Sequence, residues 1–325
     1  MTSKKLGKTT LTVAAVLSAA ALSSAAAALI TTKLLVNTAL DRNTPNLMKN
    51  SGSRISGSEK DPETAELISN LAAELENTEH ETVRISGGNG VTLVGHFFPA
   101  ENAERIIIAF HGWRSSWAKD YGMISKFWHS QNSSVLYVEQ RGQNQSGGEY
   151  MGFGLTERFD CITWANWANL RCGNSIPIYL AGISMGATTV LMASDLNLPQ
   201  NVHGIMADCG FTSPKAIFRF VAKNNLHIGY GIRSIIADYM CKKKINMGLD
   251  DHSTLDALSK TNIPVLFVHG TDDHFVPVEM TYENYKACVS KKRLLIVPGA
   301  DHAMSYLVDK PLYERAVKEF WHDFD

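Results

Sequence analysis

Residues 177–187 read Pro-Ile-Tyr-Leu-Ala-Gly-Ile-Ser-Met-Gly-Ala, an apolar run that ends in a serine between two glycines. The run at 177–181 predicts a buried strand and the residues after Gly186 predict a helix, so Ser184 is expected on a sharp turn between them. Glycine at 182 and 186 permits the strained backbone and the close approach of neighbouring elements that such a turn needs. A Gly-x-Ser-x-Gly sequence is weak evidence by itself. Between a strand and a helix it predicts a nucleophilic serine rather than an ordinary turn residue.

Further short apolar runs lie on both sides of this one, and segments of helix length separate most of them. The expected strands cover residues 81–86, 91–98, 105–110, 134–139, 177–181, 202–208, 264–269 and 293–297. Strands that alternate with helices predict an α/β fold, in which a mostly parallel sheet has helices on both faces. Reactive groups gather at the carboxyl ends of the strands in such a sheet, so the chemistry is expected directly after each apolar run.

A serine needs a base to remove its proton, so a histidine and an acid are expected at later strand ends. Asp272 and Asp273 follow the strand at 264–269, and His302 follows the strand at 293–297. His302 is the expected base, because it alone among the late histidines lies on a separate strand-end loop. The order serine, acid, histidine suits a parallel α/β sheet. The residues themselves leave the choice between the two aspartates open.

Acyl transfer also needs hydrogen-bond donors for a developing oxyanion. The backbone N–H of Met185, directly after the serine, is the first expected donor. The second is expected in the loop after the strand at 105–110, which reads His111-Gly112-Trp113-Arg114. The N–H of Trp113 is the candidate in that loop.

Taken together, these motifs resemble the α/β-hydrolase superfamily. The resemblance rests on His111-Gly112, the Arg141-Gly142 turn, the serine turn, Gly270-x-x-Asp273-x-x-Val276-Pro277 and Gly299-Ala300-x-His302. It runs from about residue 62 to the C-terminus. It is closest to a bacterial membrane-anchored branch that also resembles serine aminopeptidases and prolyl-oligopeptidase-like enzymes. The resemblance implies Asp273 as the acid, and an α/β-hydrolase fold of eight strands with a helical cap after strand six.

One loop departs from the family pattern. Many relatives carry Asp-x-Arg-Gly-His-Gly-x-Ser after the fourth strand, where residues 139–146 here read Glu-Gln-Arg-Gly-Gln-Asn-Gln-Ser. The loop borders the site without supplying the serine, the base or the acid. The departure therefore bears on substrate preference and leaves the expected mechanism unchanged.

The chain is expected to have three parts: an N-terminal membrane anchor or signal segment at 1–40, a polar linker at 41–60 and a hydrolase domain at 61–325. Residues 9–32 carry no charge and follow Lys4, Lys5 and Lys8. This pattern predicts a single transmembrane helix at the cell membrane, with the catalytic domain outside the cytoplasm. The alternative is a cleaved signal peptide and a secreted enzyme. The insertion at 209–263 is too long for a bare loop and is expected to form the cap.

Composition excludes some function classes. A formal net charge of −1 argues against nucleic-acid binding. The five cysteines fit no zinc pattern and are expected as buried thiols. The motifs imply neither a cofactor nor a metal.

The leading prediction is a serine hydrolase that cleaves carboxylic esters through an acyl-enzyme, with a small-molecule ester as substrate. Aromatic residues of the insertion, among them Phe218 and Phe220, favour an acyl chain in the pocket. One alternative is a serine peptidase for short peptides or aminoacyl amides. The aspartates that this alternative offers for binding the free amine of such a substrate are Asp238, Asp250 and Asp251. The other alternative is a non-catalytic binding module.

Overall fold

The computed structural model describes residues 26–43 and 61–325 of the 325-residue chain. Within these residues, eight strands form one sheet in the order β1-β2-β4-β3-β5-β6-β7-β8. The strands are β1 (Glu81–Ser86), β2 (Thr92–Phe98), β3 (Arg105–Phe110), β4 (Ser133–Glu139), β5 (Ile178–Ile183), β6 (Val202–Asp208), β7 (Val265–Gly270) and β8 (Lys292–Val297). The pairs β1–β2 and β2–β4 are antiparallel, and the five remaining pairs are parallel. The expected eight-stranded, mostly parallel sheet is confirmed.

Helices cover both faces of the sheet, and strand β3 shows why residues 106–110 are all apolar. Ile107 and Ala109 belong to the hydrophobic cluster on one face, whereas Ile106, Ile108 and Phe110 belong to the cluster on the other. Successive residues of a strand point to opposite faces, so a sheet covered on both sides needs apolar residues at every position.

The two layers of helices come from different parts of the chain. The first face is covered by α3 (Pro62–Asn77), α4 (Trp117–Ser130), α11 (Ser305–Val308) and α12 (Lys310–Phe324). The second is covered by α5 (Glu157–Cys172), α6 (Met185–Met192), η3 (Ala193–Asp195), α9 (Thr254–Leu258) and α10 (Val278–Ala287). A short 3-10 turn, η2 (Gly88–Gly90), joins β1 to β2.

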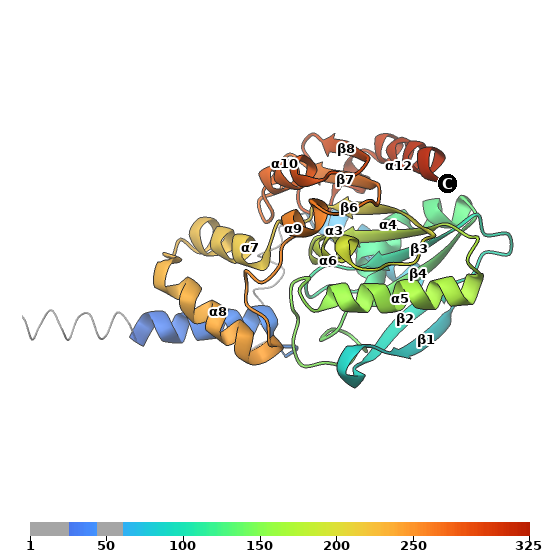
Figure 1. Cartoon of the computed structure of the whole chain (residues 1–325). Coiled ribbons are helices and arrows are strands. Elements are labelled where there is room, and N and C mark those ends of the chain that lie inside the picture. The colour runs from blue at the N-terminus through green and yellow to red at the C-terminus, as the bar shows by residue number, and fades with distance from the viewer. Residues whose placement is uncertain (1–25, 44–60) are drawn as a thin grey trace, which may run out of the picture.

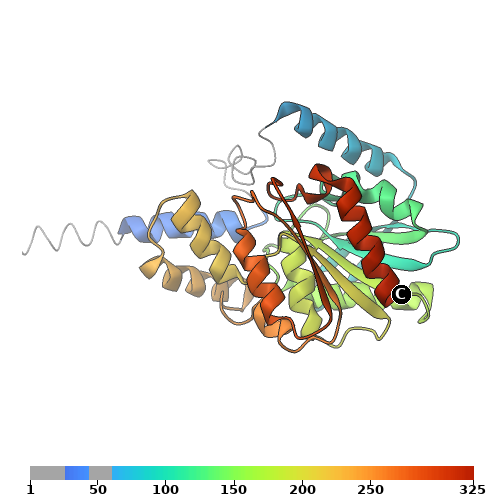
Figure 2. The same ribbon diagram turned by 90° about the horizontal axis from the view of Figure 1, so that it is seen from above.

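The cap expected after strand six is present. After β6 the chain forms α7 (Pro214–Phe220), the π-helical turn η4 (Val221–Asn225) and α8 (Gly231–Ile245) before α9 returns it to the sheet. Ser213 begins α7 by accepting a hydrogen bond from the N–H of Ala216, and Pro214 follows at the first helical position. Helices α7 and α8 project to one side of the sheet in both views (Figures 1 and 2).

A further helix over residues 26–40, called the N-terminal helix here, lies beside the cap (Figures 1 and 2). Its buried residues Val36 and Leu40 share a hydrophobic cluster with the cap residues Ile217, Ala237 and Cys241. The sequence places residues 26–43 in a separate anchor and linker, but they pack as part of the folded unit.

Polar contacts also hold the end of the N-terminal helix. The guanidinium of Arg114 donates to the carbonyl oxygens of Thr38 and Asp41, at 2.7 and 2.6 Å. The Asp41 carboxylate pairs with Lys244 of α8 at 2.6 Å. The N–H of Met151 donates to the carbonyl of Leu40 at 2.7 Å. The carbonyl groups that a helix leaves unpaired at its C-terminus are thus bonded by the rest of the domain.

The transmembrane helix predicted at residues 9–32 is wrong as far as the structure describes the chain. Among residues 26–43 and 61–325, no helix combines the length and the apolar character needed to span a membrane. The described part of that segment, residues 26–32, belongs to the N-terminal helix, in which Thr32 is buried and the apolar positions Val36 and Leu40 contact protein. Residues 1–25 lie outside the described residues, and the expected location of the protein stays a prediction.

Candidate active site

Ser184 lies on the turn between β5 and α6. Its backbone angles are φ 55° and ψ −115°, a strained conformation for a residue with a side chain. A Cβ atom at Gly186 would overlap the carbonyl oxygen of Phe110, and one at Gly182 would overlap that of Gly186. Glycine is therefore required at both positions. The N–H of Ser184 donates to the carbonyl of Asp208 at 2.9 Å, which ties the turn to β6.

The structure brings the predicted serine, histidine and aspartate into one hydrogen-bonded chain. The Oγ of Ser184 lies 2.9 Å from Nε2 of His302. The Nδ1 of His302 lies 2.6 Å from Oδ2 of Asp273. All three side chains are buried, with exposed fractions of 4%, 5% and 7% for Ser184, His302 and Asp273. This geometry suits proton transfer from the hydroxyl to the imidazole.

Asp273 is held as an ionised carboxylate. Its Oδ1 accepts hydrogen bonds from the N–H groups of Phe275 and Val276, at 2.9 and 2.8 Å. Its Oδ2 contacts both His302 and the buried His269, the latter at 3.1 Å. Burial alone would raise the pKa of Asp273, but His302 and the hydrogen bonds outweigh burial and hold this pKa below its ordinary value. Asp272 is exposed and accepts a hydrogen bond from Thr271 instead.

His302 has a strong affinity for a proton. Burial would lower the pKa of this imidazole, but the adjacent Asp273 carboxylate outweighs burial and raises the pKa well above the usual histidine value. The ring of Phe275 meets the His302 ring edge to face, with the ring centroids 5.1 Å apart. The imidazole is thus fixed by a carboxylate on one side and an aromatic ring on another.

The two expected oxyanion donors lie on elements adjacent to the serine. Met185 is the first residue of α6. Gly112, just before Trp113, lies close to the serine, since a Cβ atom added to Gly112 would be 3.5 Å from the Cβ of Ser184. The N–H groups on either side of Trp113 are used: Gly112 donates to Asp120 and Arg114 to Gln143, both at 2.6 Å. In the part of the chain that the structure describes, no acceptor is assigned to the Trp113 N–H. Its role as a donor to substrate stays a prediction.

The loop at 139–146, which departs from the family pattern, holds residues 111–115 in place. The sequence analysis did not predict this supporting role. Gln140 donates from its side chain to the carbonyl of His111 and accepts from Thr189 at 3.0 Å. Asn144 donates to the carbonyl of Ser115 at 2.9 Å. With the Gln143 contact, these amides hold residues 111–115 in place. The unusual run of amide side chains was the available signal.

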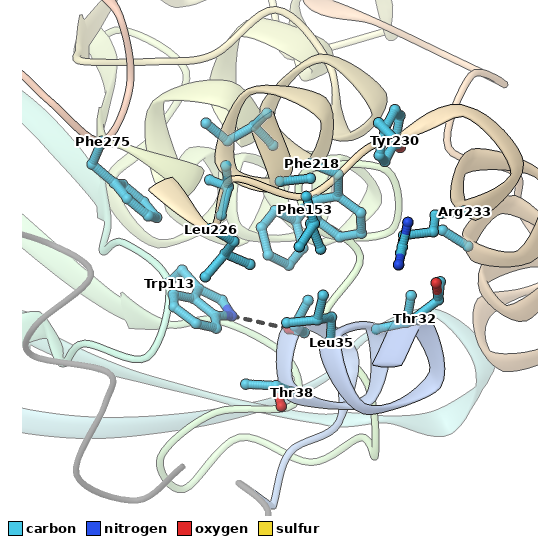
Figure 3. A pocket seen from close by; sticks show the side chains of 17 residues that line it. Thr32, Leu35, Thr38, Trp113, Phe153, Phe218, Leu226, Tyr230, Arg233 and Phe275 are labelled. Atoms are coloured by element: carbon cyan, nitrogen blue, oxygen red, sulfur yellow. Dashed lines mark hydrogen bonds between the residues drawn. The ribbon is translucent and has the colours of Figure 1, made fainter. Parts of the chain in front are cut away.

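A cavity of about 120 Å³ lies beside the site (Figure 3). Ser184 does not line it. Trp113, which follows Gly112 beside the serine, and Phe275, which contacts His302, both do. The other walls come from α7, η4, α8 and the N-terminal helix, including Leu35 and Val36. The sequence did not indicate that residues before 41 contribute to a pocket.

The aromatic residues of the insertion at 209–263 lie in different places, and only some of them line the cavity. Phe218 and Tyr230 line the cavity, whereas Phe220 does not. Tyr239 is 61% exposed, and Phe211 is buried in the cluster beneath the cap.

The aspartates considered for an amine-binding site are engaged elsewhere. Asp238 pairs with Lys242 at 2.8 Å, Asp250 pairs with Lys215, and Asp251 accepts from the N–H of Gly248 at 2.7 Å. None of the three lines the cavity. They offer no support for a peptidase of the aminopeptidase type.

One group of possible metal ligands occurs among the described residues. Atoms of Cys209, Asp273 and His302 lie within 4.8 Å of one another. Burial raises the pKa of the Cys209 thiol to about 11, so the thiol stays protonated and is a weak ligand. The other two members already belong to the hydrogen-bonded chain with Ser184.

Relatives among curated proteins are similar over most of the chain. The uncharacterised protein YqkD of Bacillus subtilis is 27% identical over 253 residues, which is 75% of this chain and 80% of YqkD. The uncharacterised protein YfhR of Escherichia coli K12 is 24% identical over 228 residues, or 68% of this chain and 73% of YfhR.

Solved structures with the same fold include a protein named as an esterase and a protein solved with ferulic acid bound. Esterase Pf2001 of Pyrococcus furiosus superposes with a TM-score of 0.61 at 22% identity, covering 76% of this chain and 93% of the esterase. Est1E of Butyrivibrio proteoclasticus, solved with ferulic acid bound, gives a TM-score of 0.55 at 18% identity, covering 74% and 98%. At these identities the likeness shows the fold.

The family model of the prolyl oligopeptidase family matches residues 120–323. This range is more than half of the 325-residue chain and contains the serine turn, Asp273 and His302. The resemblance expected from the motifs is thereby confirmed. The match and the fold together show that this protein is a hydrolase of the prolyl oligopeptidase family, built on the α/β-hydrolase fold.

Proposed function

We propose that this hydrolase is a serine hydrolase that cleaves carboxylic esters through an acyl-enzyme. The observation that carries the proposal is the hydrogen-bonded chain from Ser184 through His302 to Asp273, next to an apolar cavity. Ser184 is the nucleophile, His302 the base and Asp273 the group that orients the base and stabilises its charged form.

The mechanism follows from the position of each group. His302 accepts the proton of the Ser184 hydroxyl at Nε2 while the oxygen attacks the ester carbonyl. The N–H groups of Met185 and Trp113 donate to the resulting oxyanion. His302 then gives its proton to the departing alcohol, and the acyl group remains on Ser184. Water attacks the acyl-enzyme as His302 takes its proton, the carboxylic acid leaves, and the proton returns to Ser184.

Two observations support an ester over a peptide as substrate. The cavity lining is mostly aliphatic and aromatic, so it favours a carbon chain. The cap aspartates that could bind a peptide amine form other bonds. The name of the structural relative from Pyrococcus furiosus, an esterase, points the same way. The family match favours a peptidase as the second candidate, because the same serine chemistry cleaves amides.

Substitution of the serine tests the proposal. Ser184→Ala is expected to lower kcat/KM for p-nitrophenyl butyrate by ~10⁴-fold or more, because no other group can carry the acyl intermediate. A fluorophosphonate probe should label Ser184 in the wild type, as read by peptide mass spectrometry. Ser130→Ala is the control, since this exposed serine ends α4 just before the start of β4, whereas Ser184 follows the carboxyl end of β5. Retention of a tenth of the activity in Ser184→Ala would sink the proposal.

A panel of substrates separates the two candidate reactions. The wild type is expected to cleave p-nitrophenyl butyrate with a higher kcat/KM than alanine p-nitroanilide. Faster cleavage of the anilide than of any ester would instead establish the peptidase.

A further inference from the structure

The cavity has one polar end, and ester chemistry does not account for it. Among the described residues that line the cavity, Arg233 is the one charged side chain. Figure 3 shows Phe275 and Trp113 toward one end of the cavity, and Arg233, Tyr230 and Thr32 toward the other. The end with Phe275 is the end nearest His302. The charged end therefore faces the far end of any group that extends from Ser184 into the cavity.

The polar atoms at this end have few partners. Arg233 is half-buried, and its Nη1 donates to the carbonyl of Gly229 at 2.9 Å. The Nε of Arg233 and the hydroxyl of Tyr230 are buried and have no hydrogen-bond partner within residues 26–43 and 61–325. Burial raises the pKa of Tyr230 to about 12, so its hydroxyl keeps a proton to donate. Buried donors without acceptors are rare, and they are expected where a ligand supplies the acceptor.

The acidic side chains near Tyr230 do not fill this role. Asp238 and Asp250 lie close enough to affect the Tyr230 pKa, but each is paired with a lysine, Lys242 and Lys215 respectively. The guanidinium thus keeps its Nε edge available. The Nε and Nη2 groups of arginine present two parallel donors that match the two oxygens of a carboxylate.

We propose that Arg233 and Tyr230 bind a carboxylate at the far end of the substrate's acyl chain, so that the preferred substrates are monoesters of dicarboxylic acids. The inference rests on the proposed function, because it places an acyl chain of a Ser184 ester in the cavity. The apolar walls contact the methylene groups between the two ends. The carboxylate accepts from Nε and Nη2 of Arg233 and from the Tyr230 hydroxyl.

Matched pairs of substrates test the proposal. The p-nitrophenyl monoesters of adipic and suberic acid are compared with p-nitrophenyl hexanoate and octanoate, which have the same numbers of acyl carbons and end in methyl. In the wild type, kcat/KM for the better monoester is expected to equal or exceed that for its methyl-ended partner. A kcat/KM for the monoester at least tenfold below that for the methyl-ended ester, at both chain lengths, would overturn the proposal.

Variants assign the preference to the polar end. Arg233→Met keeps the length of the side chain and removes its charge, so the monoester-to-alkyl ratio of kcat/KM should fall at least tenfold, mainly through KM. Arg233→Lys should restore part of the ratio, since it returns the charge without the paired donors. Tyr230→Phe should lower the ratio by a smaller factor. Lys223→Met removes an exposed cap charge that does not line the cavity and should leave the ratio unchanged.

The outcomes separate this inference from the proposed function. Ser184→Ala could be inactive while Arg233→Met and Tyr230→Phe lower kcat/KM equally for the monoester and the methyl-ended ester of each pair. In that case the carboxylate site is wrong and the serine mechanism stands. If Ser184→Ala keeps its activity, the proposed function fails first. Free adipate and hexanoate provide a second measurement, since adipate should be the stronger competitive inhibitor of the wild type and should lose this advantage in Arg233→Met. Thermal melting of each variant confirms that it is folded.

Discussion

Asp208, at the end of β6, is a buried residue whose backbone carbonyl accepts from the N–H of Ser184. Its Oδ1 accepts a hydrogen bond from Ser305 at 3.2 Å. Burial raises its pKa to about 6 from 3.8, partly offset by His269 and by the bond from Ser305. The folded chain therefore keeps a proton here between about pH 4 and 6 that the unfolded chain has lost. Stability falls as the pH rises through this window, by up to about 3 kcal/mol.

Asp208→Asn removes this titration. The asparagine does not titrate, so the variant is expected to lose that part of the pH dependence. The free energy of unfolding of the variant should therefore rise relative to that of the wild type as the pH increases from 5 to 8. The measurement is the free energy of unfolding from urea denaturation of both proteins at the two pH values. An equal difference between variant and wild type at pH 5 and pH 8 would show that Asp208 is ionised throughout.

The Asp273 carboxylate is expected to set the pH dependence of hydrolysis. The base must be neutral to accept a proton, and the adjacent carboxylate raises the pKa of His302, so kcat/KM should rise with pH to a midpoint above the usual histidine value of about 6.5. Asp273→Asn should move this midpoint to lower pH and reduce the plateau by ~10⁴-fold. The pH profile of kcat/KM with an activated aryl ester measures both effects.

Asp272→Asn is the matched control for Asp273→Asn. Asp272 is exposed and its carboxylate has no bond to His302, so neither the midpoint nor the plateau should change. A larger effect at Asp272 than at Asp273 would reverse the assignment of the acid.

Single residues could be predicted where the signal is local in sequence. Ser184 directly follows the apolar strand β5, and His302 lies on the loop after β8, so the sequence predicts both as site residues. The residues alone leave Asp272 and Asp273 equivalent, and the family resemblance favours Asp273, the aspartate that is hydrogen-bonded to His302 29 residues away. The run of amide side chains marks the loop of Gln143 but not the group that Gln143 bonds, and no local signal marks Arg233. Their positions depend on how the loop and the cap fold over the site, and no short motif records that.

At the scale of the elements, helix α7 separates two phenylalanines that the sequence treated alike. Phe218 lines the cavity and meets Phe153 edge to face at 4.9 Å, whereas Phe220 packs outside the cavity. Residues two apart on a helix point in different directions. The cap sequence predicted an apolar lining, but only the structure shows which face of α7 supplies it.

Selectivity for acyl length should therefore depend on Phe218 and not on Phe220. Each buried methylene contributes about 0.8 kcal/mol, or roughly fourfold in kcat/KM. For the wild type, kcat/KM of p-nitrophenyl esters should rise from acetate to hexanoate. Phe218→Ala should flatten this rise at least fivefold, and Phe220→Ala should preserve it. A series of acetate, butyrate and hexanoate esters on the three proteins gives the comparison, and equal flattening in both variants would contradict it.

At the scale of the whole molecule, the fold was predictable because a doubly covered sheet leaves a plain record. Strand β3 and strand β6 match the apolar runs at 105–110 and 202–208 at both ends, and β7 is displaced by one residue from the run at 264–269. The location of the N-terminal helix was not predictable. An uncharged helix is apolar whether lipid or protein surrounds it, so residues 26–32 read the same in either case. Only long-range contacts such as Arg114 to Thr38 distinguish the two.

Removal of the N-terminal segment tests whether the pocket needs it. A chain that begins at Asp61 lacks Leu35 and Val36 from the cavity wall, and the Ala39 carbonyl that accepts from the Trp113 indole at 2.9 Å. The shortened chain is expected to keep its sheet, as measured by circular dichroism. Its ratio of kcat/KM for the hexanoate ester to that for the acetate ester should fall at least tenfold. Lys33→Ala, an exposed position on the same helix, should behave as the wild type. An unchanged hexanoate-to-acetate ratio in the shortened chain would rule out a role for the helix in the pocket.

The ion pair between Asp41 and Lys244 joins residues 203 positions apart, and it has a consequence for the order of assembly. During synthesis, residues 26–43 leave the ribosome long before the cap that covers their apolar side exists. The helix is made first and finds its partners late, and contacts at such separations form slowly. A newly made chain thus gains its sheet before it gains a closed pocket, so recovery of hydrolysis after dilution from denaturant should lag behind recovery of secondary structure.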